Sequence, residues 1–372
     1  MDEFHLLCPA VVFWPCSVHF PAGGTSGNRI GPPIVHFRCQ CGIARGNLSP
    51  ELLVGRHRFT GKERFARLMD MVSFAKAKAR KKEKGEEISR ITSRDNRWLK
   101  RFRACLGGEE GGDGIVGLEG VRLVEAALGS ELAVEALLVS ESGERHLARL
   151  SGSIAAELQI LRTTDRLFAG IADTQTPQGV AALVRPKVAT VEDVLKGVAL
   201  VAVLVGVQDP GNVGTILRAA EAFGATGVAT CSAAGVGTAN PLAPKAMRAS
   251  AGSALRLPIL RGISCAILLA QLRVSGVKLY AAVRDSDAPL GRQTGGVPRL
   301  VRPWEADWKS PVAVLIGNEG AGLPEEIIES CDARVSIPQR ESGKTSGVES
   351  LNAAMAGSVL LYEAMRQRGA VG

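Results

Sequence analysis

A continuous apolar run, ALVAVLVGV at residues 199–207, most constrains the fold of this chain. An unbroken run of aliphatic residues is typical of a central strand that is buried on both faces of a parallel sheet. Further apolar segments of strand length follow at 226–230, 278–283, 312–317 and 333–338. Helical segments separate them, so we predict an α/β fold with a parallel sheet covered by helices on both faces.

The segments between these strands carry signals for helix starts and ends. The first helix is predicted over 213–223, with Asn212 as its N-cap and Gly224 just after its end. APKAMRASAGSAL, at 243–255, is predicted to be one helix, and the last helix is predicted to run from about Ser350 to Arg368.

Upstream of this series the chain changes character twice. Short helical and strand segments alternate through residues 88–186, as in a small α/β module. Residues 1–87 are irregular, and a dense run of Lys and Arg begins near Met71. We therefore predict an N-terminal extension at 1–87, a small α/β domain at 88–186 and a larger α/β domain at 195–372.

The charge of the chain indicates an acidic partner. The net charge is +8 and the pI is about 9.2, which favours an acidic polymer such as RNA. Aromatic residues make up only 4%, which argues against a base-stacking β platform. A basic stretch after the lysine-rich run is a candidate for phosphate contacts, although such runs are also typical of a solvated helix or arm. Its candidate RNA-binding residues are Arg94, Arg97, Lys100 and Arg101.

Cysteine and histidine spacing indicates neither disulfides nor a metal. The eight cysteines include no CxxC pair, which favours reduced thiols in a cytosolic protein. Four of the five histidines lie near four cysteines in the first 57 residues, but their spacing fits no zinc frame, so no metal is predicted. No segment resembles a membrane span or a signal peptide. These features predict a cytoplasmic protein with no membrane partner.

Ligands of parallel α/β sheets bind outside the carboxyl ends of the strands, so the loops there are candidate sites. QDPGNVGTILRAAEAFG, at 208–224, lacks GxGxxG spacing; taken alone, Asn212 could be only a cap and Arg218 only a surface residue. LIGNEGAGLPEEI, at 315–327, has three glycines that would let the backbone face a ligand. Glu319 in it is interpreted equally well as an anchor for backbone amides or as a ligand contact.

The third loop, ESGKTSGVESLN at 341–352, has the ending of a phosphate-binding loop. A Walker A loop needs a glycine where this chain has Pro338, so a triphosphate site is disfavoured, and Lys344 is more consistent with a loop cation near RNA. Ser350 fits the cap of the last helix. Asn352 fits that helix less well, because asparagine inside a first turn is a poor helix former.

Together and in this order, the three loops resemble those of the SpoU/TrmH family of RNA ribose 2′-O-methyltransferases. The matching residues are Asn212 and Arg218 in the first motif, Gly317-Asn318-Glu319-Gly320 in the second, and Ile337-Pro338 with Glu349-Ser350-Leu351-Asn352 in the third. GLEGVRLVEAAL and TPQGVAALV, within 88–186, are similar to the family's small substrate-binding domain, which has an L30e-like fold. The resemblance covers about 198–368, and the loop between Pro338 and Gly347 is longer than in many members.

The resemblance implies a catalytic domain with a C-terminal trefoil knot that binds S-adenosylmethionine, needs no metal and forms a homodimer. The catalytic residues it implies are Arg218, Asn212, Ser350, Asn352 and Glu319. The cofactor-binding residues it implies are Gly317, Asn318, Gly320, Ile337, Pro338, Ser350 and Leu351. Because a guanidinium pKa lies above about 12, we expect Arg218 to grip a phosphate and stabilise oxyanion charge, while a phosphate oxygen or water takes the proton.

The RNA target is less constrained. A separate L30e-like module favours a structured RNA, ribosomal before transfer RNA, with Lys344 among its contacts. Three alternatives remain: a transfer RNA 2′-O-methyltransferase, a non-catalytic RNA- or ribosome-binding protein on the same fold, and a nucleotide hydrolase that uses Gly343-Lys344-Thr345.

Overall fold

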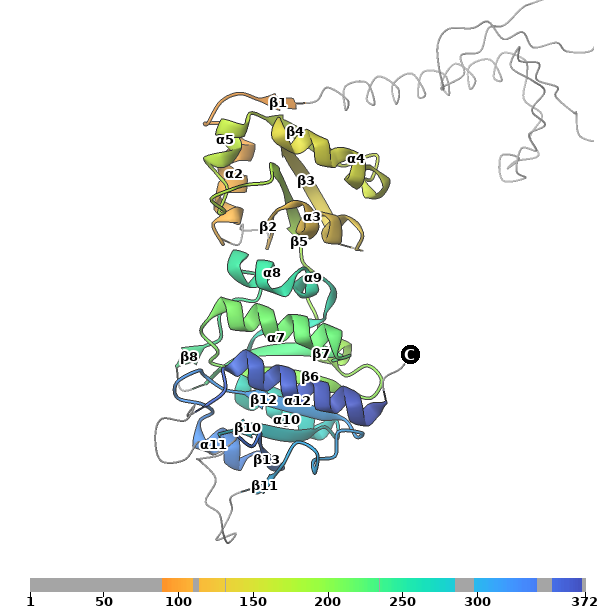
Figure 1. Ribbon diagram of the computed structural model, residues 1–372, viewed down its shortest axis with the longest axis vertical. Helices are drawn as coiled ribbons and strands as arrows, with labels where there is room; N and C mark the ends of the chain where they lie inside the picture. Colours follow the sequence, from red (N-terminus) through yellow and green to blue (C-terminus); the bar gives the residue numbers. More distant parts are fainter. Residues whose placement is uncertain are drawn as a thin grey trace, which may run out of the picture. The chain divides into compact units, whose positions relative to one another are not determined.

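The computed structural model describes residues 89–109, 114–130, 132–233, 235–284, 298–339 and 350–369. Two sheets organise these residues, one of five strands and one of eight (Figure 1). The predicted extension at 1–87, Lys344, Glu349 and the long loop of the third motif lie outside the described residues. None of the helices in the described ranges combines the length and apolar character that crossing a bilayer requires.

The first sheet is mixed and has the strand order β1-β4-β3-β5-β2. Its strands are β1 (Ser89–Ile91), β2 (Val116–Glu119), β3 (Ala133–Ser140), β4 (Gln159–Thr163) and β5 (Val180–Arg185). The helices of this region are α2 (Arg97–Leu106), α3 (Val121–Leu128), α4 (Leu147–Leu150) and α5 (Asp165–Ala169), with 3-10 turns at Ser142–His146 and Ser151–Ser153. β1, β4 and β3 run parallel, and β5 runs antiparallel to both of its neighbours. Phe102 and Phe168 fill a core between α2, α5 and this sheet.

The second sheet has the order β11-β13-β10-β12-β6-β7-β8, and β9 also pairs with β7. Its strands are β6 (Leu200–Val205), β7 (Gly227–Ala233), β8 (Val236–Gly237), β9 (Ile259–Ser264), β10 (Lys278–Val283), β11 (Arg299–Val301), β12 (Val312–Ile316) and β13 (Ala333–Ser336). Every pairing is parallel except that of β7 with β8. The predicted parallel sheet is therefore confirmed, and the run that predicted it forms its fully buried strand β6.

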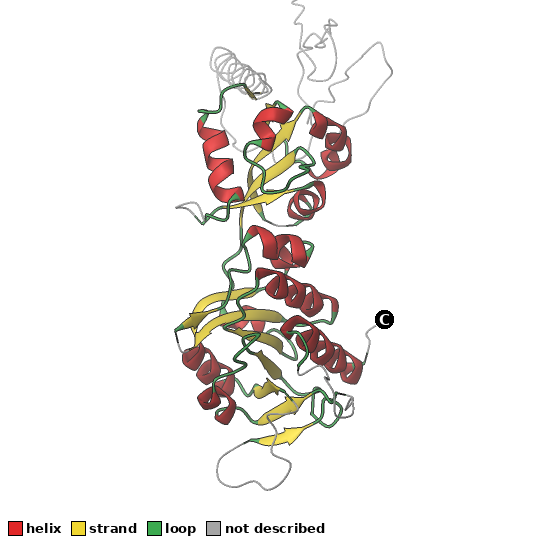
Figure 2. Cartoon of the chain, turned by 60° about the vertical axis from the view of Figure 1, so that its left-hand side comes forward, coloured by secondary structure: helices red, strands yellow, loops and turns green. Residues whose placement is uncertain are grey.

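Helices lie on both sides of the eight-stranded sheet (Figure 2). One side carries α7 (Pro210–Ala222), α8 (Pro244–Ser250), α9 (Ser253–Arg256) and α12 (Ala353–Arg368); the other carries α6 (Val191–Val194), α10 (Cys265–Val274) and α11 (Glu325–Glu329). Alternate residues of β6 serve the two cores: Leu200 and Ala202 pack with α7 and α12, and Val201 and Val203 pack with α10. This two-residue period is why the strand must be apolar throughout.

α7 and α12 pack side by side and run in the same direction (Figure 1). A hydrogen bond joins Asn212 to Asn352 near their first turns, and the rings of Phe223 and Tyr362 meet near the far end, with centroids 5.7 Å apart. Between these points Gly357 lets α12 lie close to β12, since a Cβ at Gly357 would lie 2.7 Å from a methyl carbon of Ile316 in that strand. Both helices therefore begin at the same edge of the sheet.

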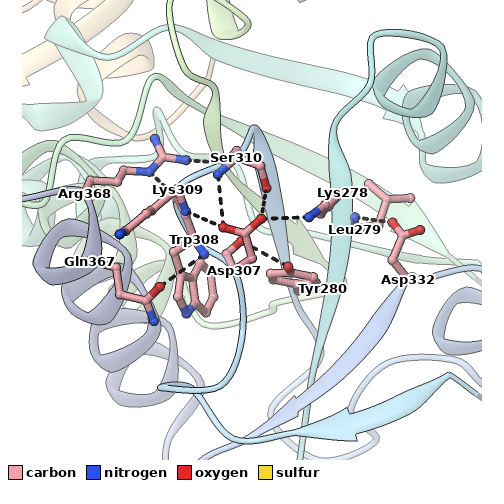
Figure 3. Close-up of polar contacts among 10 residues, drawn as sticks. All are labelled: Lys278, Leu279, Tyr280, Asp307, Trp308, Lys309, Ser310, Asp332, Gln367 and Arg368. Atoms are coloured by element: carbon pink, nitrogen blue, oxygen red, sulfur yellow. Dashed lines mark hydrogen bonds and ion pairs between the residues drawn. The ribbon is translucent and has the colours of Figure 1, made fainter.

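The other end of α12 is held by Arg368 (Figure 3). Its guanidinium donates hydrogen bonds to four backbone carbonyls, those of Trp308 (2.7 Å), Val198 (2.7 Å), Ala199 (2.9 Å) and Ser310 (3.0 Å). The indole of Trp308 is fully buried and donates to the carbonyl of Pro303 at 2.7 Å. One arginine thus fastens the last helix to the segments that lead into β6 and β12.

Three predicted helix boundaries are wrong. α7 begins at Pro210, because Asp209 caps it by accepting from the amide of Gly211 at 3.2 Å and proline is favoured at a first helical position. α12 begins at Ala353, so Asn352 and not Ser350 is the N-cap. The helix predicted over 243–255 divides into α8 and α9, because Ala251 and Gly252 adopt left-handed conformations. Gly224, with φ +74°, follows α7 as predicted.

Candidate active site

Glu319 joins the second loop to the first. It follows β12, and its carboxylate accepts hydrogen bonds from the amide of Gln208 (3.1 Å), the amide of Asp209 (3.1 Å) and Nδ2 of Asn212 (2.9 Å). Of its two interpretations from sequence, the anchoring one describes the contacts found. The carboxylate holds the backbone turn from which α7 begins.

The side chain of Asn212 forms hydrogen bonds with both Glu319 and Asn352, so it links the second loop to the third. A carboxylate only accepts hydrogen bonds, so the Asn212 amide must turn its nitrogen towards Glu319 and its oxygen away. That oxygen accepts from Nδ2 of Asn352 at 3.0 Å, and Oδ1 of Asn352 accepts from the amides of Ala354 (2.9 Å) and Met355 (3.3 Å). The orientation of each amide follows from its neighbour, and one chain of side chains connects three loops that are far apart in sequence.

Opposing effects act on the Glu319 carboxyl. Burial, the largest of them, would raise its pKa, but the hydrogen bonds from Asn212, Gln208 and Asp209 together outweigh it. The net result is a pKa below the ordinary value of 4.5. Glu319 is therefore ionised at neutral pH and is poorly suited to act as a general base.

Glu319→Gln should lower the free energy of unfolding by about 0.5–1.5 kcal/mol at pH 7, because a carboxamide cannot accept from all three donors and water can reach these exposed groups. Since the folded-state pKa is depressed, ionised Glu319 stabilises the fold above pH 4.5, and this contribution is lost as the pH falls through the folded-state pKa. Urea unfolding from pH 3 to pH 8 measures the difference.

The control for this pH series is Glu329→Gln, because Glu329 is exposed and its side chain has no hydrogen-bond partner in the described part of the chain. That variant should stay close to wild type throughout. A Glu319→Gln effect that is the same size at pH 3 and pH 7 would contradict the assigned role.

Asn318 shapes the second loop from within. Its Nδ2 donates to the carbonyl of Gly206 at 2.9 Å, and its Oδ1 accepts from the amides of Gly320 (2.9 Å) and Ala321 (3.0 Å). Its backbone also pairs with that of Gly322. The predicted cofactor contact by Asn318 therefore remains a prediction, while its side chain already serves to fold the loop.

A pocket opens at the carboxyl edge of the eight-stranded sheet. Of the predicted cofactor residues, Gly317, Asn318, Gly320, Ile337, Ser350 and Leu351 line it; Pro338 does not. Glu319 lines it too, so the pocket adjoins the chain of side chains formed by Glu319, Asn212 and Asn352. Sequence reasoning missed Ala282, Val283 and Arg284, which also line it at the carboxyl end of β10. That strand was predicted, and the end of a parallel strand at the same edge was the available signal.

Arg218 stands apart from this network. It is exposed on α7, and the described part of the chain offers its side chain no hydrogen bond or ion pair. Arg218 lies six positions after Asn212 along α7, a rise of about 9 Å. Within one chain, Asn212, Glu319 and Asn352 are brought together and Arg218 is not.

The predicted RNA-binding residues gather on and before α2. Lys100 forms an ion pair with Asp95 at 3.2 Å, and Arg101 forms a two-bond ion pair with Glu135. Arg94 and Arg97 are exposed. Over the described ranges no group of His, Cys, Asp and Glu could hold a metal, and the four cysteines there are buried and form no disulfide with one another.

Comparison with known proteins places this geometry in a family. A family model described as the SpoU rRNA Methylase family matches residues 199–362, and one described as the MRM3-like substrate binding domain matches 113–182. An uncharacterised tRNA/rRNA methyltransferase of Synechocystis sp. is 32% identical over 295 residues, which are 76% of this chain and 96% of that protein. The chain belongs to the SpoU rRNA methylase family. The predicted SpoU/TrmH family of S-adenosylmethionine-dependent RNA 2′-O-methyltransferases is thereby confirmed.

Other relatives agree. The 23S rRNA (guanosine(2553)-2'-O)-methyltransferase RlmP of Bacillus subtilis is 30% identical over 66% of this chain and 86% of its own length. The crystal structure of the AdoMet-bound rRNA methyltransferase from Sinorhizobium meliloti has a TM-score of 0.61 and 28% identity, and the alignment covers 75% of this chain and 98% of that one. The SpoU methyltransferase AviRb of Streptomyces viridochromogenes, in complex with AdoMet, has a TM-score of 0.60 and 26% identity. That alignment covers 73% of this chain and 99% of that one.

Proposed function

We propose that this SpoU-family chain methylates a ribose 2′-hydroxyl in structured ribosomal RNA, in the cytoplasm, where this RNA and the cofactor are found. The observation that carries the proposal is the hydrogen-bonded chain from Glu319 through Asn212 to Asn352, beside a glycine-lined pocket. We further propose that residues 88–186 form an L30e-like RNA-binding domain and that residues 195–372 form the catalytic domain, closed by a trefoil knot.

The pocket residues are suited to S-adenosylmethionine. Gly317 and Gly320 expose backbone groups to which a nucleoside and an amino acid can bond, and Ile337 and Leu351 supply apolar walls. When bound, the cofactor supplies a methyl group on a sulfonium. The protein then has to place the ribose oxygen in line with that group and keep water out.

The catalytic domain contains no histidine, so the commonest general base is absent. We assign orientation of the reacting ribose to Asn212, Ser350 and Asn352. We assign to Arg218 the grip on an RNA phosphate and the stabilisation of negative charge on the 2′-oxygen. A phosphate oxygen or a water molecule takes the proton.

We propose that a homodimer brings Arg218 to the site, because one chain does not bring Arg218 into contact with Asn212 or Asn352. α12 offers a face for the second copy: Met355, Val359 and Tyr362 are 61%, 41% and 49% exposed. Their spacing of four and three residues puts them on one side of the helix. An exposed apolar stripe of this kind favours association with a partner.

Gly317→Ala should abolish cofactor binding. A Cβ at Gly317 would lie 2.4 to 2.6 Å from backbone atoms of Gly322 and Leu323, so the loop that lines the pocket would have to open. The matched control is Gly237→Ala, because Gly237 does not line the pocket and no atom lies within 4 Å of a Cβ there. Calorimetry with S-adenosylmethionine should show no measurable heat for the first variant and near wild-type affinity for the second. Equal affinities would contradict the assignment of this loop.

The test of the function is a map of 2′-O-methylated nucleotides in cells with and without this protein. The proposal predicts loss of a ribosomal RNA position and no change in transfer RNA. Loss confined to transfer RNA would favour the alternative target, and no loss would favour a non-catalytic RNA-binding protein. Calorimetry with ATP tests the nucleotide hydrolase, for which the proposal predicts no binding.

A further inference from the structure

The residues around α2 carry positive charge that the protein itself does not neutralise. Some exposed arginines elsewhere in the described ranges have an acidic partner, as Arg149 has Glu125 and Arg256 has Glu221. Arg94, Arg97 and Arg103 have no hydrogen bond or ion pair from their side chains to any described residue, and they lie within ten residues of one another. Charge left unpaired in this way is available for phosphates.

An indole lies among these arginines. Trp98 is half-buried and packs against the core of the first sheet. The guanidinium carbons of Arg97 and Arg101 each lie 5.8 Å from its ring centroid. A fully structural tryptophan would be covered by apolar neighbours, whereas Trp98 keeps part of its surface exposed and has two cations beside its ring.

The two flanking arginines differ in freedom. Arg101 is held by Glu135, whose oxygen accepts from Nη2 at 2.9 Å, and this ion pair fixes the guanidinium beside the ring. Arg97 has no such partner among the described residues, so it can leave the ring without breaking an ion pair. The core and Arg101 thus hold Trp98 in place, and movement of Arg97 can expose more of its ring.

We propose that Trp98 is a stacking site for one unpaired base of the RNA substrate, with Arg97 and its unpaired neighbours holding the adjacent phosphates. This rests on the proposed function in that the ligand is the RNA to be methylated. An aromatic ring with flanking cations recognises a base in a loop, bulge or single strand. A fully paired A-form helix keeps its bases stacked inside and offers only phosphates and sugars. The RNA therefore has an unpaired nucleotide at the first domain.

The test uses the full chain and two probes, a single-stranded RNA of twelve adenosines and a fully paired RNA duplex of the same length. Trp98→Leu removes the stacking ring, and Trp98→Phe keeps one. Trp304→Leu is the control, because Trp304 is a 58% exposed tryptophan of the eight-stranded region. S-adenosylmethionine binding, followed by calorimetry, checks that every variant is folded.

Trp98→Leu should raise the Kd for the single strand roughly 5- to 100-fold. Trp98→Phe should stay within a few-fold of wild type, Trp304→Leu should match wild type, and the Kd for the duplex should not change. The slope of the logarithm of the binding constant against the logarithm of salt concentration should be unchanged in Trp98→Leu. In Arg97→Ala its magnitude should fall by about one, since only the arginine contacts a phosphate. Tryptophan fluorescence should be quenched by the single strand in wild type and not in Trp98→Phe.

Equal affinities of wild type and Trp98→Leu for the single strand would overturn the proposal, as would an equal loss for both probes. A methyl-transfer assay, separate from the binding measurements, shows whether the proposed function is wrong. Wild type would then transfer no methyl group to 23S ribosomal RNA transcribed in vitro, while the fluorescence and affinity measurements would still report whether a base stacks on Trp98.

Discussion

Arg218→Ala should reduce methyl transfer by about 100- to 1,000-fold and leave S-adenosylmethionine affinity close to that of the wild type. Arg218 is exposed, its side chain forms no hydrogen bond or ion pair with a described residue, and it does not line the pocket, so its removal should disturb neither the fold nor the cofactor. The loss arises only in the transition state, where the 2′-oxygen carries negative charge. Single-turnover rates with saturating RNA and calorimetry with the cofactor separate the two effects.

The control for this change is Arg273→Ala. Arg273 is an exposed arginine of α10, on the opposite side of the sheet from α7. The Arg273→Ala substitution lowers the net charge by the same amount as Arg218→Ala and should leave the rate of methyl transfer near that of the wild type. Substantial transfer by Arg218→Ala would remove this arginine from the mechanism, and a matching loss in Arg273→Ala would reduce its role to general charge.

Arg368→Ala should lower the free energy of unfolding by about 2–4 kcal/mol, a large effect for one side chain. Four carbonyls lose a charged donor, and the last turn of α12 loses its attachment to the segments before β6 and β12. Because the side chain is only partly buried, water can reach some of these carbonyls, which keeps the estimate below the sum of four charged hydrogen bonds. Urea unfolding measures the change.

Arg366→Ala is the matched control two residues earlier on the same helix. Arg366 is more than half exposed, and its ion pair is with Glu363, one turn away on the same helix. Exposed pairs of this kind contribute about 0.3–0.5 kcal/mol, so the variant should unfold near wild type. Similar losses in the two variants would show that Arg368 acts through helix content and not through its four carbonyl contacts.

The sheet was predictable because the physical signal is local. Residues 200–205 had to be apolar at every position, since alternate side chains enter different cores. A short, unbroken aliphatic run of this kind is typical of a strand buried on both faces. The start of α7 was also accessible, because Asp209-Pro210 is a recognised cap and first position. The prediction failed there by assigning Asn212 a role that the residue three places earlier already had.

The connection between the loops could not be predicted from spacing. Glu319 and Asn212 are 107 positions apart, and Asn212 and Asn352 are 140 apart, so no local pattern relates them. The sequence showed only that Asn352 was costly inside a first turn. The structure gives the reason for that residue: one amide caps α12 with its oxygen and reaches Asn212 with its nitrogen.

The central claim is that a glycine-lined pocket presents a methyl donor to a ribose hydroxyl of RNA. The most direct measurement incubates the purified chain with tritiated S-adenosylmethionine and unmodified 23S ribosomal RNA, followed by nuclease digestion and separation of the nucleosides. We expect label in a single 2′-O-methylated nucleoside, entering about 100- to 1,000-fold more slowly with Arg218→Ala. Label on a base, or label that enters at the wild-type rate with Arg218→Ala, would contradict the claim.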